Sequence, residues 1–138
     1  MKIVGGTTGG AAVSSCEQSN INVTSWTPIT SLPIAPYQTA MVTLLGKAYV
    51  IGGNGGAQTS VNMYDGVSMW VAKAAMSPGR YGHAALALDN DRALVCGGYA
   101  PSVANTCVIY TASTNTWAPA PALAQVRSQF NLVMSAGM

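Results

Sequence analysis

The sequence predicts an all-β chain built from repeated units of four short antiparallel strands. Three kinds of marker recur with nearly the same period. Gly-Gly pairs that close an apolar run are spaced by 47 and then 45 residues, the tryptophans by 44 and 47, and two tyrosines by 46. A period shared by unrelated residue types indicates a tandem array. The markers are the pairs beginning at Gly5, Gly52 and Gly97, the tryptophans Trp26, Trp70 and Trp117, and the tyrosines Tyr64 and Tyr110.

Each unit begins with a hairpin of two apolar strands. The first strand has small side chains, and the turn after it has the composition of tight hairpins. The second strand is continuously apolar, as expected when both faces of a sheet are covered. Residues 38–53 align with residues 83–98 without a gap. The expected elements are strand 39–44, turn Gly46-Lys47 and strand 48–51, then strand 84–88, turn Asp89-Asn90-Asp91 and strand 93–96.

A second hairpin completes each unit. A Gly-Gly pair ends the second strand, which suits a place where the backbone adopts an unusual φ or another backbone passes too close for a Cβ. A loop rich in Gly, Ala and Ser follows, and then two more strands. The third strand is expected at residues 60–64 and 106–110, and the fourth begins at Trp70 and Trp117.

The composition is that of a folded domain with little charge. Only ten of the 138 residues are charged and 49% are hydrophobic, which excludes a mainly disordered chain. The basic residues are scattered and form no stripe for nucleic acid or a membrane surface. No apolar run approaches the roughly 18 residues that span a bilayer, and the N-terminus has no signal-peptide pattern.

Sheets with two apolar faces must stack face to face. Radial stacking around an axis, as in a β-propeller, leaves few exposed strand edges. The alanine-rich strand 84–88 suits the crowded position nearest such an axis. The predicted fold class is therefore all-β, with propeller blades of four antiparallel strands.

The order of the markers resembles the kelch repeat. An apolar run, Gly-Gly, a loop, Tyr and Trp are followed at residues 76–83 by Met-Ser-Pro-Gly-Arg-Tyr-Gly-His. The resemblance covers essentially the whole chain and is most complete between Gly46 and Trp117. In the first unit, Ala35 and Gln38 replace the Arg and His of the next copy. The resemblance implies a kelch-type propeller, similar to the kelch domains of adaptor proteins and to galactose-oxidase-like propellers.

Three units do not complete a ring, because closure below about four blades is not expected. The chain starts inside a second strand and ends inside a first strand, expected at residues 130–135, so the ends of two copies could pair. Either a homodimer closes a six-bladed ring or sequence outside the chain supplies the missing blades; both alternatives stay open. The units are approximately 1–36, 37–82 and 83–129, with 130–138 starting a further blade.

Catalysis has little support in the residues. Asp65, Asp89 and Asp91 fall in hairpin turns, where capping the backbone explains them better than a glycosidase carboxylate pair. The single histidine, His83, opens a first strand and is expected to pack between units. It cannot supply the His and Tyr cluster that copper-radical oxidases need. We therefore expect no enzyme, no cofactor and no metal site, with an oxidase or carbohydrate-active enzyme as the less favoured alternative.

The three cysteines leave two readings open. Cys96 and Cys107 lie on adjacent strands and could form a cross-strand disulfide, or they could be small buried thiols together with Cys16. Low charge and abundant Ser, Thr and Gly favour secretion, whereas the odd cysteine count and the missing signal pattern favour the cytoplasm slightly. The compartment stays undetermined.

The loops between strands are expected to carry recognition residues on a rigid scaffold. The kelch resemblance implies that Arg80 and Arg127 match arginines that line a pocket for acidic segments in adaptor domains, although they could instead tie neighbouring loops together. We predict a non-catalytic module that recognises a protein or acidic peptide. The alternatives are a secreted carbohydrate-binding or carbohydrate-active propeller and a structural piece of a homo-oligomer. The predicted contact residues are Arg80, Arg127, Tyr81, Tyr99, Tyr37 and Asn54.

Overall fold

The computed structural model describes residues 1–55 and 58–135 of the chain. Every regular element in this part is a β-strand, and all strand pairs are antiparallel. The all-β prediction is therefore confirmed. No helix in the described ranges could cross a membrane.

Three main sheets and a small ribbon make up the fold. The first sheet contains β1 (Lys2–Val4), β4 (Cys16–Gln18) and β5 (Thr27–Ile29). The second contains β6 (Ala40–Leu44), β7 (Lys47–Ile51), β8 (Val61–Tyr64) and β9 (Trp70–Ala72). The third contains β10 (Ala84–Ala87), β11 (Arg92–Cys96), β12 (Cys107–Thr111) and β13 (Thr116–Ala120). The ribbon pairs β2 (Thr7–Thr8) with β3 (Ala11–Ala12).

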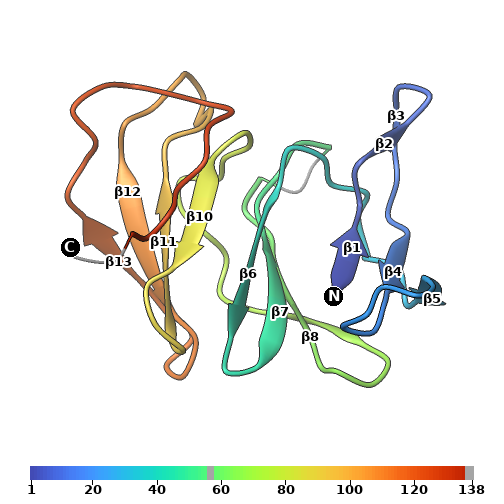
Figure 1. Ribbon diagram of the computed structural model, residues 1–138. Coiled ribbons are helices and arrows are strands. Elements are labelled where there is room, and N and C mark those ends of the chain that lie inside the picture. The colour runs from blue at the N-terminus through green and yellow to red at the C-terminus, as the bar shows by residue number, and fades with distance from the viewer. Residues whose placement is uncertain (56–57, 136–138) are drawn as a thin grey trace.

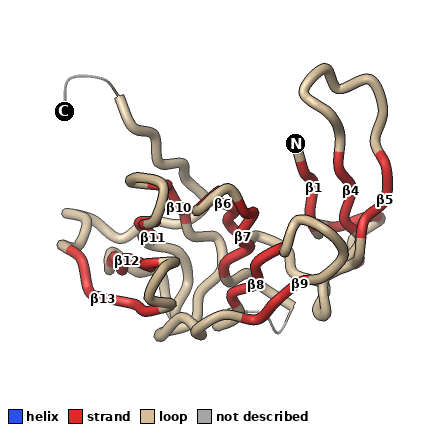
Figure 2. Tube along the Cα trace, turned by 90° about the horizontal axis from the view of Figure 1, so that it is seen from below, coloured by secondary structure: helices blue, strands red, loops and turns tan. Residues whose placement is uncertain are grey.

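The predicted four-stranded antiparallel units are confirmed in the second and third sheets, whereas the first sheet has three strands. The sheets stand side by side, with β6 and β10 in contact (Figures 1 and 2). The described residues do not close into a ring. The sheets fan outward from the line along which β6 and β10 meet.

One backbone contact repeats along this line. The Gly82 amide donates to the Gln38 carbonyl at 2.8 Å, and the Gln129 amide donates to the Gly82 carbonyl at 2.7 Å. All three residues have left-handed φ values, at 55°, 62° and 54° for Gln38, Gly82 and Gln129. Because non-glycine residues adopt this conformation at a cost, its recurrence shows that three segments occupy equivalent places.

The hairpin turns correct the sequence alignment. Leu44 pairs with Lys47 across the two residues Leu45 and Gly46, rather than around Gly46-Lys47. In the next copy, Leu88 instead reaches Arg92 around three residues, with its amide 2.8 Å from the Arg92 carbonyl. The second turn therefore contains one extra residue. The gapless alignment is wrong before this turn, and Thr39 rather than Gln38 holds the position of His83.

The segment expected to begin a further blade is not a strand. Residues 130–135 form no ladder with any described strand, and the strand stays a prediction because its pairing partner is expected outside the chain. A strand needs a neighbour to satisfy its backbone groups.

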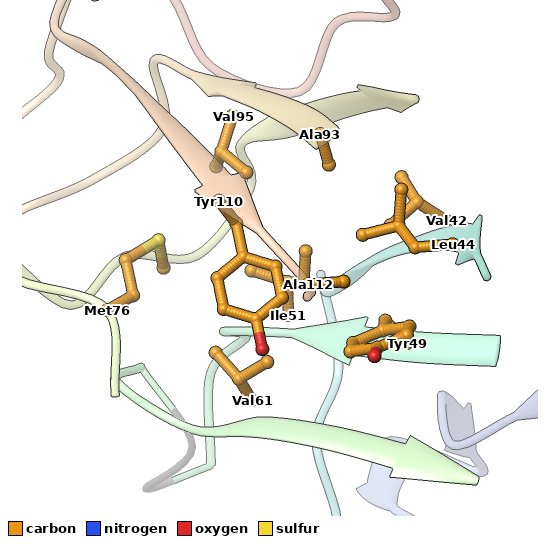
Figure 3. Close-up of a cluster of buried hydrophobic side chains, with 10 residues drawn as sticks. All are labelled: Val42, Leu44, Tyr49, Ile51, Val61, Met76, Ala93, Val95, Tyr110 and Ala112. Atoms are coloured by element: carbon orange, nitrogen blue, oxygen red, sulfur yellow. The ribbon is translucent and has the colours of Figure 1, made fainter. Parts of the chain in front are cut away.

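A dense apolar core joins the second and third sheets (Figure 3). Tyr49 of β7 and Tyr110 of β12 meet across it, with ring centroids 5.8 Å apart. Burial raises the pKa of Tyr110 to about 12. The cluster contains Val42, Leu44, Tyr49, Ile51, Val61, Met76, Ala93, Val95, Tyr110 and Ala112.

A smaller core joins the first and second sheets. It combines Val4 and Cys16 of the first sheet with Val50, Tyr64 and Trp70 of the second. The second sheet therefore buries both faces, which explains the continuous apolar run in β7.

The periodic tryptophans link neighbouring sheets. The Trp70 indole donates to the Thr30 carbonyl at 2.8 Å, and the Trp117 indole donates to the Ala74 carbonyl at 2.9 Å. Each acceptor lies four residues beyond the tryptophan of the preceding sheet. The same bond is thus made twice.

The Gly-Gly pairs permit a close approach between loops. Gly52 and Gly97 have φ values of 59° and 66°, and a Cβ on either would lie 2.6 Å from the carbonyl oxygen of Arg80 or Arg127, respectively. Both conditions exclude a side chain, so the glycines follow from geometry as well as conformation.

We predict that Gly97→Ala destabilises the chain more than Gly46→Ala does. Gly46 has a similar φ of 71°, but a Cβ there would meet nothing within 4 Å. The control therefore carries the left-handed conformational cost alone, and the difference in free energy of unfolding should exceed about 1 kcal/mol. Urea denaturation measures both variants, and equal midpoints would contradict the close-approach argument.

Candidate functional site

The loops at one end of the second and third sheets bring two equivalent residue pairs together. Tyr37 and Asn54 form an isolated antiparallel bridge, and Tyr81 and Tyr99 form the corresponding one. The Asn54 amide donates to the Tyr37 carbonyl at 2.7 Å, and the Tyr99 amide donates to the Tyr81 carbonyl at 2.9 Å. Four of the six residues predicted to contact a partner therefore lie in two matching bridges.

The side chains of these two bridges are partly accessible. The rings of Tyr81 and Tyr99 stack with centroids 5.0 Å apart and an interplanar angle of 13°. Both residues, and also Tyr37 and Asn54, are half-buried. The bridge hydrogen bonds hold the backbone of each residue, so its ring face or side-chain amide can face a partner. We call Tyr37, Asn54, Tyr81 and Tyr99 the tyrosine surface.

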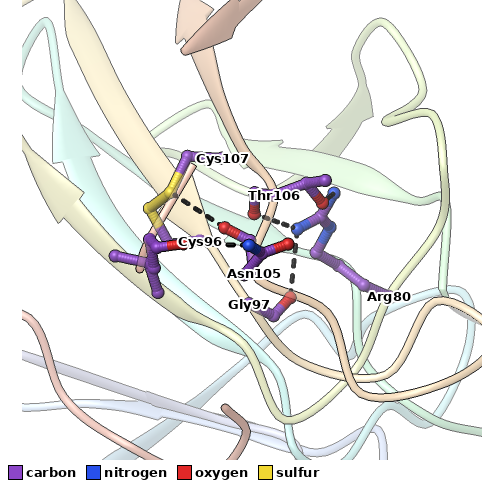
Figure 4. The surroundings of a disulfide bond; sticks show 7 residues. Arg80, Cys96, Gly97, Asn105, Thr106 and Cys107 are labelled. Carbon is purple, nitrogen blue, oxygen red and sulfur yellow. Dashed lines mark hydrogen bonds between the residues drawn. A yellow bond between two sulfur atoms is a disulfide. The ribbon is translucent and has the colours of Figure 1, made fainter. Parts of the chain in front are cut away.

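Arg80 is fully buried, with 0% of its surface exposed. Its Nη1 donates to the carbonyl oxygens of Gly97 at 3.0 Å and Thr106 at 2.9 Å, and its Nη2 donates to Thr106 Oγ1 at 3.3 Å (Figure 4). Burial lowers the pKa of Arg80. The guanidinium ties the loop before β10 to both ends of the loop between β11 and β12, which is the structural alternative drawn from the sequence.

Arg127 holds the equivalent position but is exposed. The Gly98 amide donates to its carbonyl at 2.9 Å, as the Gly53 amide does to Arg80 at 3.0 Å. Its guanidinium lies 5.8 Å from the centroid of the Phe130 ring. No further sheet stands next to it in the described ranges, so the carbonyls that hold Arg80 have no counterpart there.

Cys96 and Cys107 form a disulfide across β11 and β12 (Figure 4). The structure therefore has the cross-strand disulfide, and only Cys16 is a buried free thiol. Burial raises the pKa of the Cys16 thiol, which makes it a poor nucleophile. The disulfide lies beside the Arg80 hydrogen bonds and links β11 and β12, the strands on either side of the loop that carries Tyr99.

His83 is 5% exposed, and neither ring nitrogen has a hydrogen-bond partner among the described residues. Burial and the nearby Arg80 charge lower its pKa to about 4, although the Ile51 carbonyl partly opposes this shift. The ring is therefore neutral at pH 7. It fills the space above Gly52, as the Phe130 ring does above Gly97.

A cavity of about 490 Å³ opens beside His83, where equivalent residues of three repeats converge. Its wall contains no charged side chain. Sequence reasoning missed this cavity, although the equivalence of Thr39, His83 and Phe130 would have indicated it once the turn was correctly aligned. The lining residues are Gln38, Thr39, Gly82, His83, Gln129, Phe130 and Asn131.

The turn carboxylates are occupied by backbone groups. Asp65 Oδ1 accepts the amides of Val67, Ser68 and Met69, and these bonds, with Met69 first, lower its pKa. Asp89 Oδ1 likewise accepts the Asp91 and Arg92 amides. Among the described residues there is no group of three or more His, Cys, Asp or Glu that could hold a metal ion. No protein-family model and no curated protein matches the chain, so function must be argued from these sites.

We predict that Arg80→Ala destabilises the chain by about 2 kcal/mol or more, because it leaves buried carbonyls without donors. The same change at exposed Arg127 should cost less than about 0.5 kcal/mol in the monomeric chain. Thermal unfolding at low protein concentration compares the two variants. Equal losses would show that Arg80 does not hold the loops.

We also predict a pH-dependent stability that originates at His83. Its folded pKa of about 4 is below the unfolded value of about 6.5, so the unfolded chain binds a proton first as the pH falls. This contribution is complete above pH 6.5 and is lost progressively toward pH 4, by up to about 3 kcal/mol. His83→Phe, which copies the residue at position 130, should flatten the profile over that window in urea titrations. An unchanged slope would assign the effect elsewhere.

Proposed function

We propose that the chain is an arc of a kelch-type β-propeller that acts as a non-catalytic recognition module for a protein or peptide segment. The observation that carries this proposal is the pair of matching bridges that present Tyr37, Asn54, Tyr81 and Tyr99 at one end of adjacent sheets. Flat aromatic groups with restricted conformations provide large contact area at low entropic cost.

Repetition of contacts supports the propeller arrangement. The hydrogen bonds that link Gln38, Gly82 and Gln129 recur along the line where β6 and β10 meet, and the tryptophan bonds recur between neighbouring sheets. A stack in which each sheet contacts the next in the same way is typical of a propeller.

Partner chemistry follows from the charges at this surface. Arg80 is taken up by backbone carbonyls, so the acidic preference suggested by two arginines now depends on Arg127 alone. The tyrosine surface itself carries no charged side chain. A largely uncharged segment fits it best.

A second candidate, carbohydrate binding by a secreted propeller, is favoured by two observations. The Cys96–Cys107 disulfide suits an oxidising compartment. The cavity beside His83 is lined by the amides Gln38, Gln129 and Asn131 and by the Phe130 ring. Amides can hydrogen-bond to sugar hydroxyls, and an aromatic ring can stack against the apolar face of a sugar.

Panning of the purified chain against a random peptide library tests the first proposal. Enriched peptides should lose at least about tenfold in affinity for the Tyr81→Ala/Tyr99→Ala double variant, because the stacked pair supplies the central contact. Val67→Lys is the control, since Val67 is 82% exposed in a distant turn. Calorimetry measures each affinity. Peptides that bind the double variant unchanged would exclude the tyrosine surface, and glycan-array binding without peptide binding would favour the second candidate.

A further inference from the structure

The first sheet has an unpaired edge with a groove beside it. β1 pairs with β4 alone, whereas its equivalents β7 and β11 lie between two strands. A cavity of about 430 Å³ runs along this edge, between Met1 and Lys2 on one side and Met41, Val42 and Thr43 of β6 on the other. In the other two sheets the corresponding place is filled by a first strand. An extended segment fits this groove by adding a strand to the edge.

The segment that matches the groove lies at the other end of the chain. Phe130 is equivalent to His83, so residues 131–133 correspond to 84–86, the start of β10. Val133 and Met134 are exposed, at 83% and 55%, and residues 130–135 pair with no described strand. The register of β10 against β11 would place Val133 opposite Lys2.

The third sheet has an apolar face that no neighbouring sheet covers. Leu86, Leu94 and Ile109 stand opposite one another in register, on the face away from the second sheet. They belong to neither buried cluster of the described residues. The equivalent row in the second sheet, Val42, Tyr49 and Met63, packs against the third sheet. The outer row therefore has the composition of an inter-sheet contact.

Two polar groups also lack the partners that their equivalents have. The first group is the Arg127 guanidinium. Its equivalent in the repeat, Arg80, binds the carbonyls of Gly97 and Thr106. The first-sheet residues equivalent to Gly97 and Thr106 are Gly5 and Ser15, and in both pairs the glycine amide donates to the other residue's carbonyl at 3.0 Å. The Trp26 indole, unlike those of Trp70 and Trp117, has no acceptor in the described ranges. In the other two bonds the acceptor lies four residues after the tryptophan of the preceding sheet. The equivalent acceptor for Trp26 would be the carbonyl of residue 121, four residues after Trp117.

We propose that a second copy of this chain supplies all these missing contacts in a head-to-tail dimer. Residues 131–134 of one copy add to β1 of the other, and the first sheet covers the Leu86–Leu94–Ile109 row. Arg127 then binds the Gly5 and Ser15 carbonyls of the second copy. Because each copy offers both halves, two identical contacts close the dimer. The inference depends on the propeller arrangement proposed above and not on which partner the tyrosine surface binds.

Light scattering during size-exclusion chromatography tests the proposal on the purified 138-residue chain. The expected mass is twice 14.1 kDa, and Arg127→Ala should raise the dimer dissociation constant by about tenfold or more. Val67→Lys, a charge change on a distant turn, should leave it unchanged. A folded monomer at high concentration, or an open-ended polymer, would overturn the proposal. Peptide binding is measured separately, so its loss does not imitate loss of the dimer.

Cysteine pairs test the register itself. Lys2→Cys with Val133→Cys should give a disulfide-linked dimer on non-reducing gels, because the two positions face each other between copies. Gln18→Cys with Val133→Cys is the matched control, since Gln18 lies one strand further away, on β4. Equal cross-linking of both pairs, or a cross-link confined to one chain, would refute the predicted pairing. Circular dichroism confirms that each variant is folded.

Discussion

The packing of one sheet's apolar face against the next determines what the rest of the chain can do. Tyr49 and Tyr110 meet in the core between the second and third sheets, and Val4 and Trp70 meet in the core before it. Burial of apolar surface supplies most of the stability in such a stack. It also requires that sheets approach closely, which is why the Gly-Gly pairs admit loop carbonyls at positions where no Cβ fits.

The close approach of the sheets buries two ionisable side chains, Arg80 and His83, in the segment before β10. The loop before β10 brings Arg80 into a fully buried position, where the carbonyls of Gly97 and Thr106 and the Thr106 hydroxyl accept its hydrogen bonds. A buried cation held by neutral acceptors is costly, and its charge disfavours a second cation nearby. Burial first, and this charge second, lower the pKa of His83 and hold it neutral beside Arg80. The same packing leaves the tyrosines half-buried, with firmly held backbones and accessible ring faces.

Periodicity made much of the fold predictable. Recurring Gly-Gly, Tyr and Trp residues predicted two four-stranded sheets, because these residues satisfy constraints that each unit shares. The extra residue in the turn at 89–91 was missed, since hairpin turns of two and three residues have similar compositions. That single residue shifted the alignment of β6 with β10 by one position and hid the equivalence of Thr39, His83 and Phe130. The strand expected at residues 130–135 stays a prediction, because a strand depends on a neighbour as well as on its own residues and no described strand pairs with this segment.

The two arginines show why a repeated residue is difficult to interpret from sequence. Arg80 and Arg127 have the same place in the repeat, yet one is buried among carbonyls and the other is exposed. Their difference arises from what stands next to them, and the sequence pattern does not record it. A residue that recurs with the period serves a contact between units wherever a next unit exists. The tyrosine surface is distinguished by a different property: its backbone bridges recur, while the side chains they carry change from Asn54 to Tyr99. Scaffold contacts repeat their chemistry, whereas the proposed recognition surface repeats its geometry and varies one side chain of each bridge.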